Sequence, residues 1–122
     1  MITGVDFALL NCTDAEASKK FYEETIGLPL RKQWGDMPAY EFDTDNLTLA
    51  VMQSDAFGQE FSKSTGAIAF QVADFDAAKA ELESRGVKFG TDTIDSGVCK
   101  QAYFEDPDGN RLAIHERYEG QG

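Results

Sequence analysis

The sequence predicts an α+β fold built from two βαβββ modules that share one core. The first observation is an internal repeat: residues 39–52 align without a gap on residues 102–115, and residues 5–20 align on residues 65–80. The second is that both copies show a strand pattern, a helix pattern and then further strand patterns. The third is length, because 122 residues suit one domain and two copies are too few for a solenoid. We therefore expect a single domain over 1–122, with module one at about 1–56 and module two at about 64–118.

The first module is delimited by caps and turns. Thr13 or Asp14 can cap a helix over 15–26 that carries apolar residues at helical spacing, and Gly27 ends it. Apolar segments bounded by turn formers read as strands. The predicted strands of this module are residues 4–11, 30–34, 39–43 and 47–53.

The second module repeats these signals. Asp74 can cap a helix over 75–85, which Gly86 ends. The turn Asp106-Pro-Asp-Gly109 joins the last two strands, since Pro fixes φ and Gly accepts a positive φ. The predicted strands of this module are residues 65–73, 87–89, 98–105 and 111–117.

Charge and cysteine content exclude several classes of partner. A net charge of −11, from 11 basic and 22 acidic residues, repels phosphate backbones and anionic lipid surfaces. Cys12 and Cys99 lack metal-binding spacing and do not resemble a disulfide framework. No leader pattern or long apolar run is present. We expect a soluble cytoplasmic protein with no nucleic-acid or membrane partner.

Several motifs together resemble the vicinal-oxygen-chelate superfamily, which includes glyoxalase I, bleomycin resistance proteins and extradiol dioxygenases. They are the two βαβββ modules, the run Asp14-x-x-x-Ser18-x-x-Phe21-Tyr22, the following Gly27-Leu28, and Asp106-Pro-Asp-Gly-Asn110 before the last strand. The resemblance covers essentially the whole chain. It implies that each module forms a curled mixed sheet, a half-cup with one helix packed outside, and that the protein is a homodimer.

The resemblance also implies where a metal would bind. Catalytic members hold one divalent metal through four ligands, and those family positions fall on Phe7, Ala50, Ala67 and Ala113. The internal repeat pairs Phe7 with Ala67 and Ala50 with Ala113. Metalloenzymes need imidazole nitrogen or carboxylate oxygen at such positions, and none of these four side chains carries a lone pair. We therefore expect no metal, no cofactor and no catalytic residue, as in the bleomycin-resistance-like branch.

Strand alternation predicts which side chains line the half-cups. A lining of small and apolar residues suits a flat, aromatic or cationic ligand. The candidate aromatic walls are Trp34, Phe42, Phe57, Tyr40 and Tyr103, and the repeat equivalence of Tyr40 and Tyr103 suggests a packing role for these two. The side chains expected in the half-cups are Val5, Phe7, Leu9, Thr48, Ala50, Met52, Thr65, Ala67, Ala69, Arg111, Ala113 and His115, and the predicted ligand-binding residues are Phe7, Trp34, Ala50, Met52, Ala67, Ala113 and His115.

Three functions stay open at this point. The first is a small-molecule binding protein that sequesters an aromatic or cationic ligand, as in antibiotic resistance. The second is a lyase, isomerase or dioxygenase-type enzyme with an unconventional site, for instance His115 acting with Glu116, Glu41 or Asp43. The third is an interaction module without a ligand. His115, the one histidine, is either an acid–base group or a polar residue at the rim.

Overall fold

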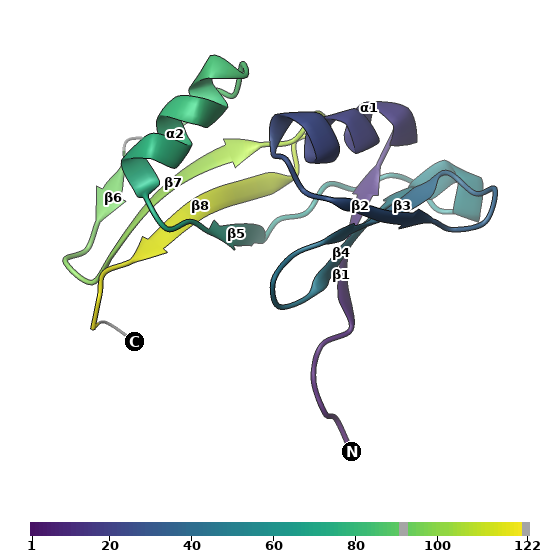
Figure 1. Ribbon diagram of the computed structural model, residues 1–122. Helices are drawn as coiled ribbons and strands as arrows, with labels where there is room; N and C mark the ends of the chain where they lie inside the picture. The colour runs from purple at the N-terminus through teal and green to yellow at the C-terminus, as the bar shows by residue number, and fades with distance from the viewer. Residues whose placement is uncertain (91–92, 121–122) are drawn as a thin grey trace. The chain divides into compact units, whose positions relative to one another are not determined.

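Each half of the chain forms a four-stranded mixed sheet with one main helix (Figure 1). The structure is a computed structural model that describes residues 1–90 and 93–120. It divides into two compact units, Met1–Ser64 and Thr65–Gly122. The α+β class and the predicted βαβββ order are confirmed in both units.

The first unit has the strand order β1-β4-β3-β2, with β1 parallel to β4 and the other pairs antiparallel. Asp14 caps the helix, because its Oδ1 accepts hydrogen bonds from the backbone N–H groups of Glu16 and Ala17 at 3.1 and 3.2 Å. The elements are β1 (Phe7–Cys12), α1 (Ala15–Lys20), η1 (Phe21–Thr25), β2 (Leu30–Gln33), β3 (Ala39–Asp43), β4 (Thr48–Gln53) and the 3₁₀ turn η2 (Ser54–Phe57).

The predicted helix over 15–26 is present, but its second half is the π-helical turn η1. The N–H of Ile26 donates to the carbonyl of Phe21 at 2.9 Å, five residues back. The turn contains Tyr22, which is fully buried with its ring centroid 5.8 Å from that of Phe42 on β3. Apolar spacing predicts that this segment is helical, but it does not separate i→i+4 from i→i+5 bonding.

The second unit repeats the topology, with the order β5-β8-β7-β6. Its last turn is held by Asp106, whose Oδ1 accepts from the N–H groups of Asp108 and Asn110 at 2.9 Å each. Asp106 Oδ2 accepts from the buried Asn110 amide at the same distance. The elements are β5 (Ala67–Gln71), α2 (Phe75–Ser84), β6 (Ile94–Asp95), β7 (Cys99–Glu105) and β8 (Arg111–Arg117).

The predicted strand over 87–89 is wrong. The edge strand is β6, which pairs Ile94 with Gln101. Val87 is buried and Phe89 packs on Phe104 with ring centroids 5.4 Å apart, so the apolar pattern marks core contacts rather than strand pairing.

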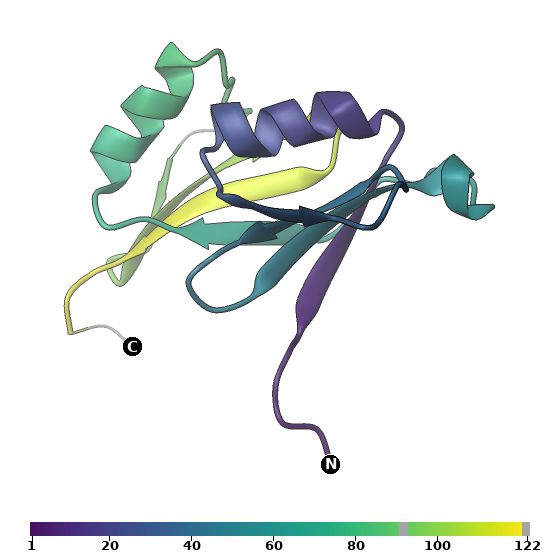
Figure 2. The same cartoon turned by 45° about the vertical axis from the view of Figure 1, so that its right-hand side comes forward.

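The two faces of each sheet have different environments (Figure 2). Helix α1 packs on β3 and β4, and α2 packs on β8. The helix-covered face of the first sheet carries Leu10, Leu49 and Val51, all buried. The opposite face is called here the helix-free face, and the strand registers confirm the predicted alternation along its strands. Val5 and Thr65, expected on that face, lie before the first residues of β1 and β5; its confirmed members are Phe7, Leu9, Thr48, Ala50 and Met52 in the first unit and Ala67, Ala69, Arg111, Ala113 and His115 in the second.

In the part of the chain that the structure describes, neither helix is long and apolar enough to cross a membrane.

Candidate ligand site

The four positions that the resemblance assigns to metal ligands lie on the helix-free faces of β1, β4, β5 and β8. Phe7 begins β1 and is 48% exposed, whereas Ala50 and Ala113 are fully buried. Ala67 begins β5 and is exposed. The two sheets therefore carry one aromatic ring and three methyl groups at these positions, and two of the methyl groups are fully buried.

The side chains around these positions do not fit a divalent metal. Glu41 lies opposite Ala50 on the neighbouring strand, and Tyr103 lies opposite Ala113. Within residues 1–90 and 93–120, no group of three or more His, Cys, Asp or Glu is placed to hold a metal ion. The side chains directly opposite the two alanines, a carboxylate at Glu41 and a phenol at Tyr103, are not the set of imidazole and carboxylate donors that such an ion needs.

An aromatic cluster lies in the first unit, formed by Phe7, Trp34 and Phe57. The ring centroids of Phe7 and Trp34 are 6.3 Å apart and their planes are nearly perpendicular, at 78°. Trp34 and Phe57 make a similar edge contact at 6.2 Å and 88°. Both geometries are the edge-to-face arrangement that aromatic quadrupoles favour. Two predicted ligand-binding residues, Phe7 and Trp34, are thus in contact.

Glu41 connects this cluster to the centre of the sheet. Trp34 Nε1 donates to Glu41 Oε2 at 2.6 Å, and the Glu41 side chain is only 15% exposed. Arg31 Nη1 lies 3.9 Å from Glu41 Oε1 and donates to Thr48 Oγ1 at 3.1 Å. An indole N–H and a guanidinium thus lie close to the Glu41 carboxylate, on the strand beside Ala50.

A β-bulge brings Arg31 to this face. The register between β2 and β3 shifts between Leu30 and Lys32, so Arg31 and Lys32 together oppose Glu41. The sequence suggests Glu41 only as a catalytic partner of His115 and gives no signal that selects Arg31. Alternation along β3 could have placed Glu41 beside Ala50, but no sequence signal located the bulge.

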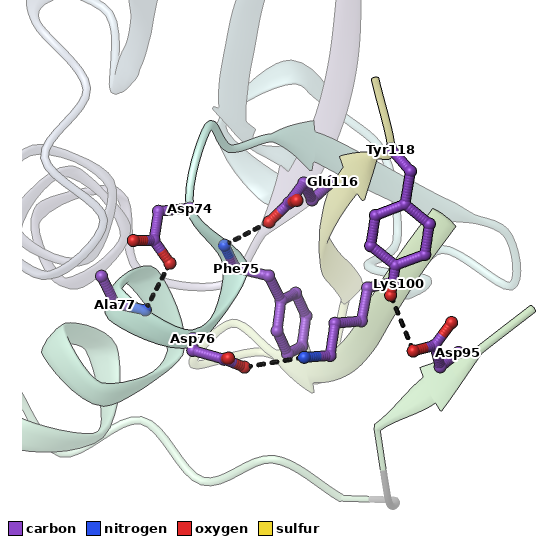
Figure 3. Close-up of polar contacts among 8 residues, drawn as sticks. All are labelled: Asp74, Phe75, Asp76, Ala77, Asp95, Lys100, Glu116 and Tyr118. Carbon is purple, nitrogen blue, oxygen red and sulfur yellow. Dashed lines mark hydrogen bonds and ion pairs between the residues drawn. The ribbon is translucent and has the colours of Figure 1, made fainter. Parts of the chain in front are cut away.

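In the second unit, His115 is half-buried on the helix-free face, opposite Gln101 and Gln71. The next residue, Glu116, points to the helix-covered face, where its Oε1 accepts from the backbone N–H of Phe75 at 2.7 Å (Figure 3). Glu116 therefore helps to cap α2. Because the two side chains point to opposite faces, the suggested catalytic pair of His115 and Glu116 is not formed.

The contacts beyond Glu116 are also structural. Lys100 Nζ lies 3.0 Å from Asp76 Oδ1 on α2, and the Tyr118 hydroxyl donates to Asp95 Oδ2 at 2.7 Å (Figure 3). This bond to Asp95 raises the pKa of Tyr118 to about 12. These contacts join α2, β6 and β7 to the end of β8 rather than forming a site.

The packing role suggested for Tyr40 and Tyr103 agrees with the burial of Tyr40, but the two residues lie on opposite faces of their sheets. Tyr40 lies opposite Val51 and is buried on the helix-covered face, whereas Tyr103 lies opposite Ala113 on the helix-free face. Arg111 stacks on Tyr103, with its guanidinium carbon 4.3 Å from the ring centroid. The structural counterpart of Tyr103 is therefore Glu41, because each lies opposite the equivalent alanine.

Comparisons with known proteins agree with this architecture. The sequence model of the Glyoxalase/Bleomycin resistance protein/Dioxygenase superfamily matches residues 4–114. The uncharacterized protein YaeR of Escherichia coli (strain K12) is 31% identical over 115 residues, which cover 86% of this chain and 89% of that protein.

Two solved structures are similar throughout. The antibiotic binding protein TnmS3 from Streptomyces sp. CB03234 has a TM-score of 0.78 and 26% identity, covering 95% of this chain and 97% of its own. Lactoylglutathione lyase from Agrobacterium tumefaciens shares the fold, with a TM-score of 0.79 and 16% identity over 95% of each chain. By the family match and this fold, the chain belongs to the Glyoxalase/Bleomycin resistance protein/Dioxygenase superfamily, the vicinal-oxygen-chelate group.

Proposed function

We propose that this protein binds a small aromatic molecule on the helix-free face of its first unit and sequesters it without a divalent metal. The observation that carries the proposal is the cluster of Phe7, Trp34 and Phe57. It lies on the sheet face where the resemblance expects metal ligands and the chain has Phe7 and Ala50. The similarity to TnmS3, an antibiotic binding protein, supports a binding role.

The residue types favour capture of a planar compound. The ring of Phe7 is about half exposed, and covering it with a ligand would remove apolar surface from water, which favours binding. A ligand bound there would be held by burial and ring contacts, which need no metal and leave the ligand chemically unchanged.

An enzymatic role has less support. Superfamily membership admits one, since the fold is shared with a lyase. The only histidine, however, has no carboxylate beside it on β8, because Glu116 points away to α2.

We propose that antibiotic sequestration by a cytoplasmic homodimer is the biological setting; sedimentation equilibrium would test the dimer.

The proposal is tested with the fluorescence of Trp34, the only tryptophan. We expect bleomycin-type compounds or small planar aromatic compounds to change its emission on titration. Phe7→Ala should weaken binding about fivefold, because one ring contact contributes about 1 kcal/mol.

Phe61→Ala is the matched control. Phe61 lies in the connector after η2 and makes no ring contact among the described residues, so this variant should bind within about twofold of the parent. Equal losses in the two variants, or no response to any compound, would contradict the proposal. Elemental analysis of protein purified without chelator provides a second check, because one equivalent of bound transition metal would also contradict it.

A further inference from the structure

We infer that the ligand carries a cationic nitrogen, and that Glu41 binds this group at the place that Arg31 now shields. The inference extends the proposed function, because it names the chemical class that the same site selects. It depends on the placement of one carboxylate and on the weakness of its present contacts.

The Glu41 side chain is 15% exposed, and only one of its two carboxylate oxygens accepts a hydrogen bond from a described residue. Its Oε2 accepts the short bond from Trp34, whereas the nearest cationic atom to Oε1 is Arg31 Nη1 at 3.9 Å, beyond hydrogen-bonding distance. Among the described residues no other donor reaches Glu41. Oε1 is not one of the fully buried side-chain oxygens that lack a hydrogen-bond partner among the described residues, so water reaches it and a cationic N–H of a ligand can take the place of that water.

Arg31 is a weak occupant of this place. Its side chain is 53% exposed and its hydrogen bond goes to the Thr48 hydroxyl rather than to the carboxylate. An exposed ion pair at this distance contributes little free energy. The guanidinium can therefore swing into solvent at small cost when a ligand cation approaches Glu41.

The aromatic cluster completes the selectivity. Trp34 donates to Glu41 and also contacts Phe7 and Phe57, so the carboxylate lies at the edge of the same aromatic surface. A planar apolar group covering the rings would carry an attached ammonium or guanidinium toward Oε1. Aromatic faces attract cations as well, whereas an anionic group would be repelled by Glu41.

The test uses three naphthyl compounds that differ only in charge: naphthylmethylamine, a cation at neutral pH, naphthylmethanol, which is neutral, and naphthylacetate, an anion. The indole N–H of Trp34 gives a single resonance in the NMR spectrum of the isotope-labelled full chain, because there is one tryptophan. We expect the amine to bind about tenfold more tightly than the alcohol, as a charge-assisted hydrogen bond would give. The acetate should bind most weakly.

Variants locate the effect. Glu41→Gln keeps an acceptor for the indole but removes the charge, so it should abolish the preference for the amine and leave the alcohol's affinity within about twofold. Asp43→Asn is the matched control, because Asp43 is exposed on the same strand and the same face. It should keep the preference. Arg31→Ala should tighten amine binding by about twofold to fivefold, because the competing guanidinium is gone.

The outcomes separate the two proposals. Equal binding of amine and alcohol by the parent protein would overturn the cation inference and leave aromatic capture standing. A preference that survives Glu41→Gln but is lost in Asp43→Asn would overturn the assignment to Glu41. If none of the three compounds shifts the Trp34 resonance, both proposals fail together.

Discussion

Tyr40 joins the first helix to its sheet through a single side chain. The hydroxyl donates to Glu16 Oε1 at 2.6 Å, and the residue is only 5% exposed. The hydrogen bond to Glu16, burial and the nearby negative charge raise the pKa of Tyr40 to about 12. Because the unfolded phenol ionises near pH 10, its contribution to stability is fully present below about pH 10 and is lost as the pH rises toward about 12.

Glu16→Ala should lower the pKa of Tyr40 toward its ordinary value, since it removes the acceptor and the charge together. Tyrosinate absorbance during an alkaline titration measures the shift, and urea unfolding at rising pH should show a smaller alkaline loss of stability in the variant than in the parent. Glu24→Ala, an exposed change in η1, is the control and should leave the titration unchanged. Identical curves for the parent and Glu16→Ala would show that the Tyr40–Glu16 bond is absent in solution.

Turn length decides which side chains the second sheet presents. In the first unit Asp43 pairs with Thr48, so residues 44–47 form the turn, whereas in the second Glu105 pairs with Arg111 across residues 106–110. The extra residue shifts β7 by one position relative to the repeat, and a shift of one position moves a side chain to the other face. Tyr103 therefore leaves the core position that Tyr40 occupies.

This register predicts that replacing tyrosine by alanine lowers the free energy of unfolding by different amounts at positions 40 and 103. Tyr40→Ala should lower the free energy of unfolding by about 3–4 kcal/mol, as expected for an aromatic ring in the core. Tyr103→Ala should cost about 1 kcal/mol, because it loses a partly exposed ring and its contact with Arg111. Urea denaturation of both variants decides the matter, and equal costs would support the ungapped repeat instead.

Sequence patterns predicted the elements better than their contacts. Caps, turn residues and apolar periodicity located both helices and the strands that carry Phe7, Ala50 and Ala113, because these signals are local. The edge strand at Ile94 was not predicted from the sequence. The preceding residues Val87 and Phe89 have a stronger apolar pattern, but their side chains pack in the core instead of forming a strand.

The same limit applies to the candidate site. The contact between Phe7 and Trp34 joins two of the residues that the sequence selected. The sequence did not predict the hydrogen bond between Trp34 and Glu41 or the position of Arg31 near Glu41. Arg31 reaches Glu41 because of a bulge between β2 and β3, and no turn residue in the sequence indicates that bulge.

The whole molecule carries a large excess of negative charge, −11 with a pI of about 4.3. Like charges repel across the folded surface and lower its stability, whereas opposite charges in contact raise it. The described ion pairs are Arg31–Glu41, Lys79–Glu83, Arg85–Glu81 and Lys100–Asp76, and each has at least one side chain more than half exposed. Such pairs contribute little, so repulsion dominates the surface electrostatics.

Salt should therefore act in opposite directions on folding and on ligand binding. Raising NaCl from low concentration to about 0.5 M screens the repulsion and should increase the free energy of unfolding by on the order of 1 kcal/mol, measured in urea, which is uncharged. The same screening should weaken the binding of naphthylmethylamine, because the attraction between its ammonium and Glu41 is reduced, while naphthylmethanol is unaffected.

Replacing the exposed Asp45 and Glu119 by lysine changes the net charge from −11 by +4 to −7 and should flatten the salt dependence of stability. A stability that falls with salt would mean that the ion pairs outweigh the repulsion.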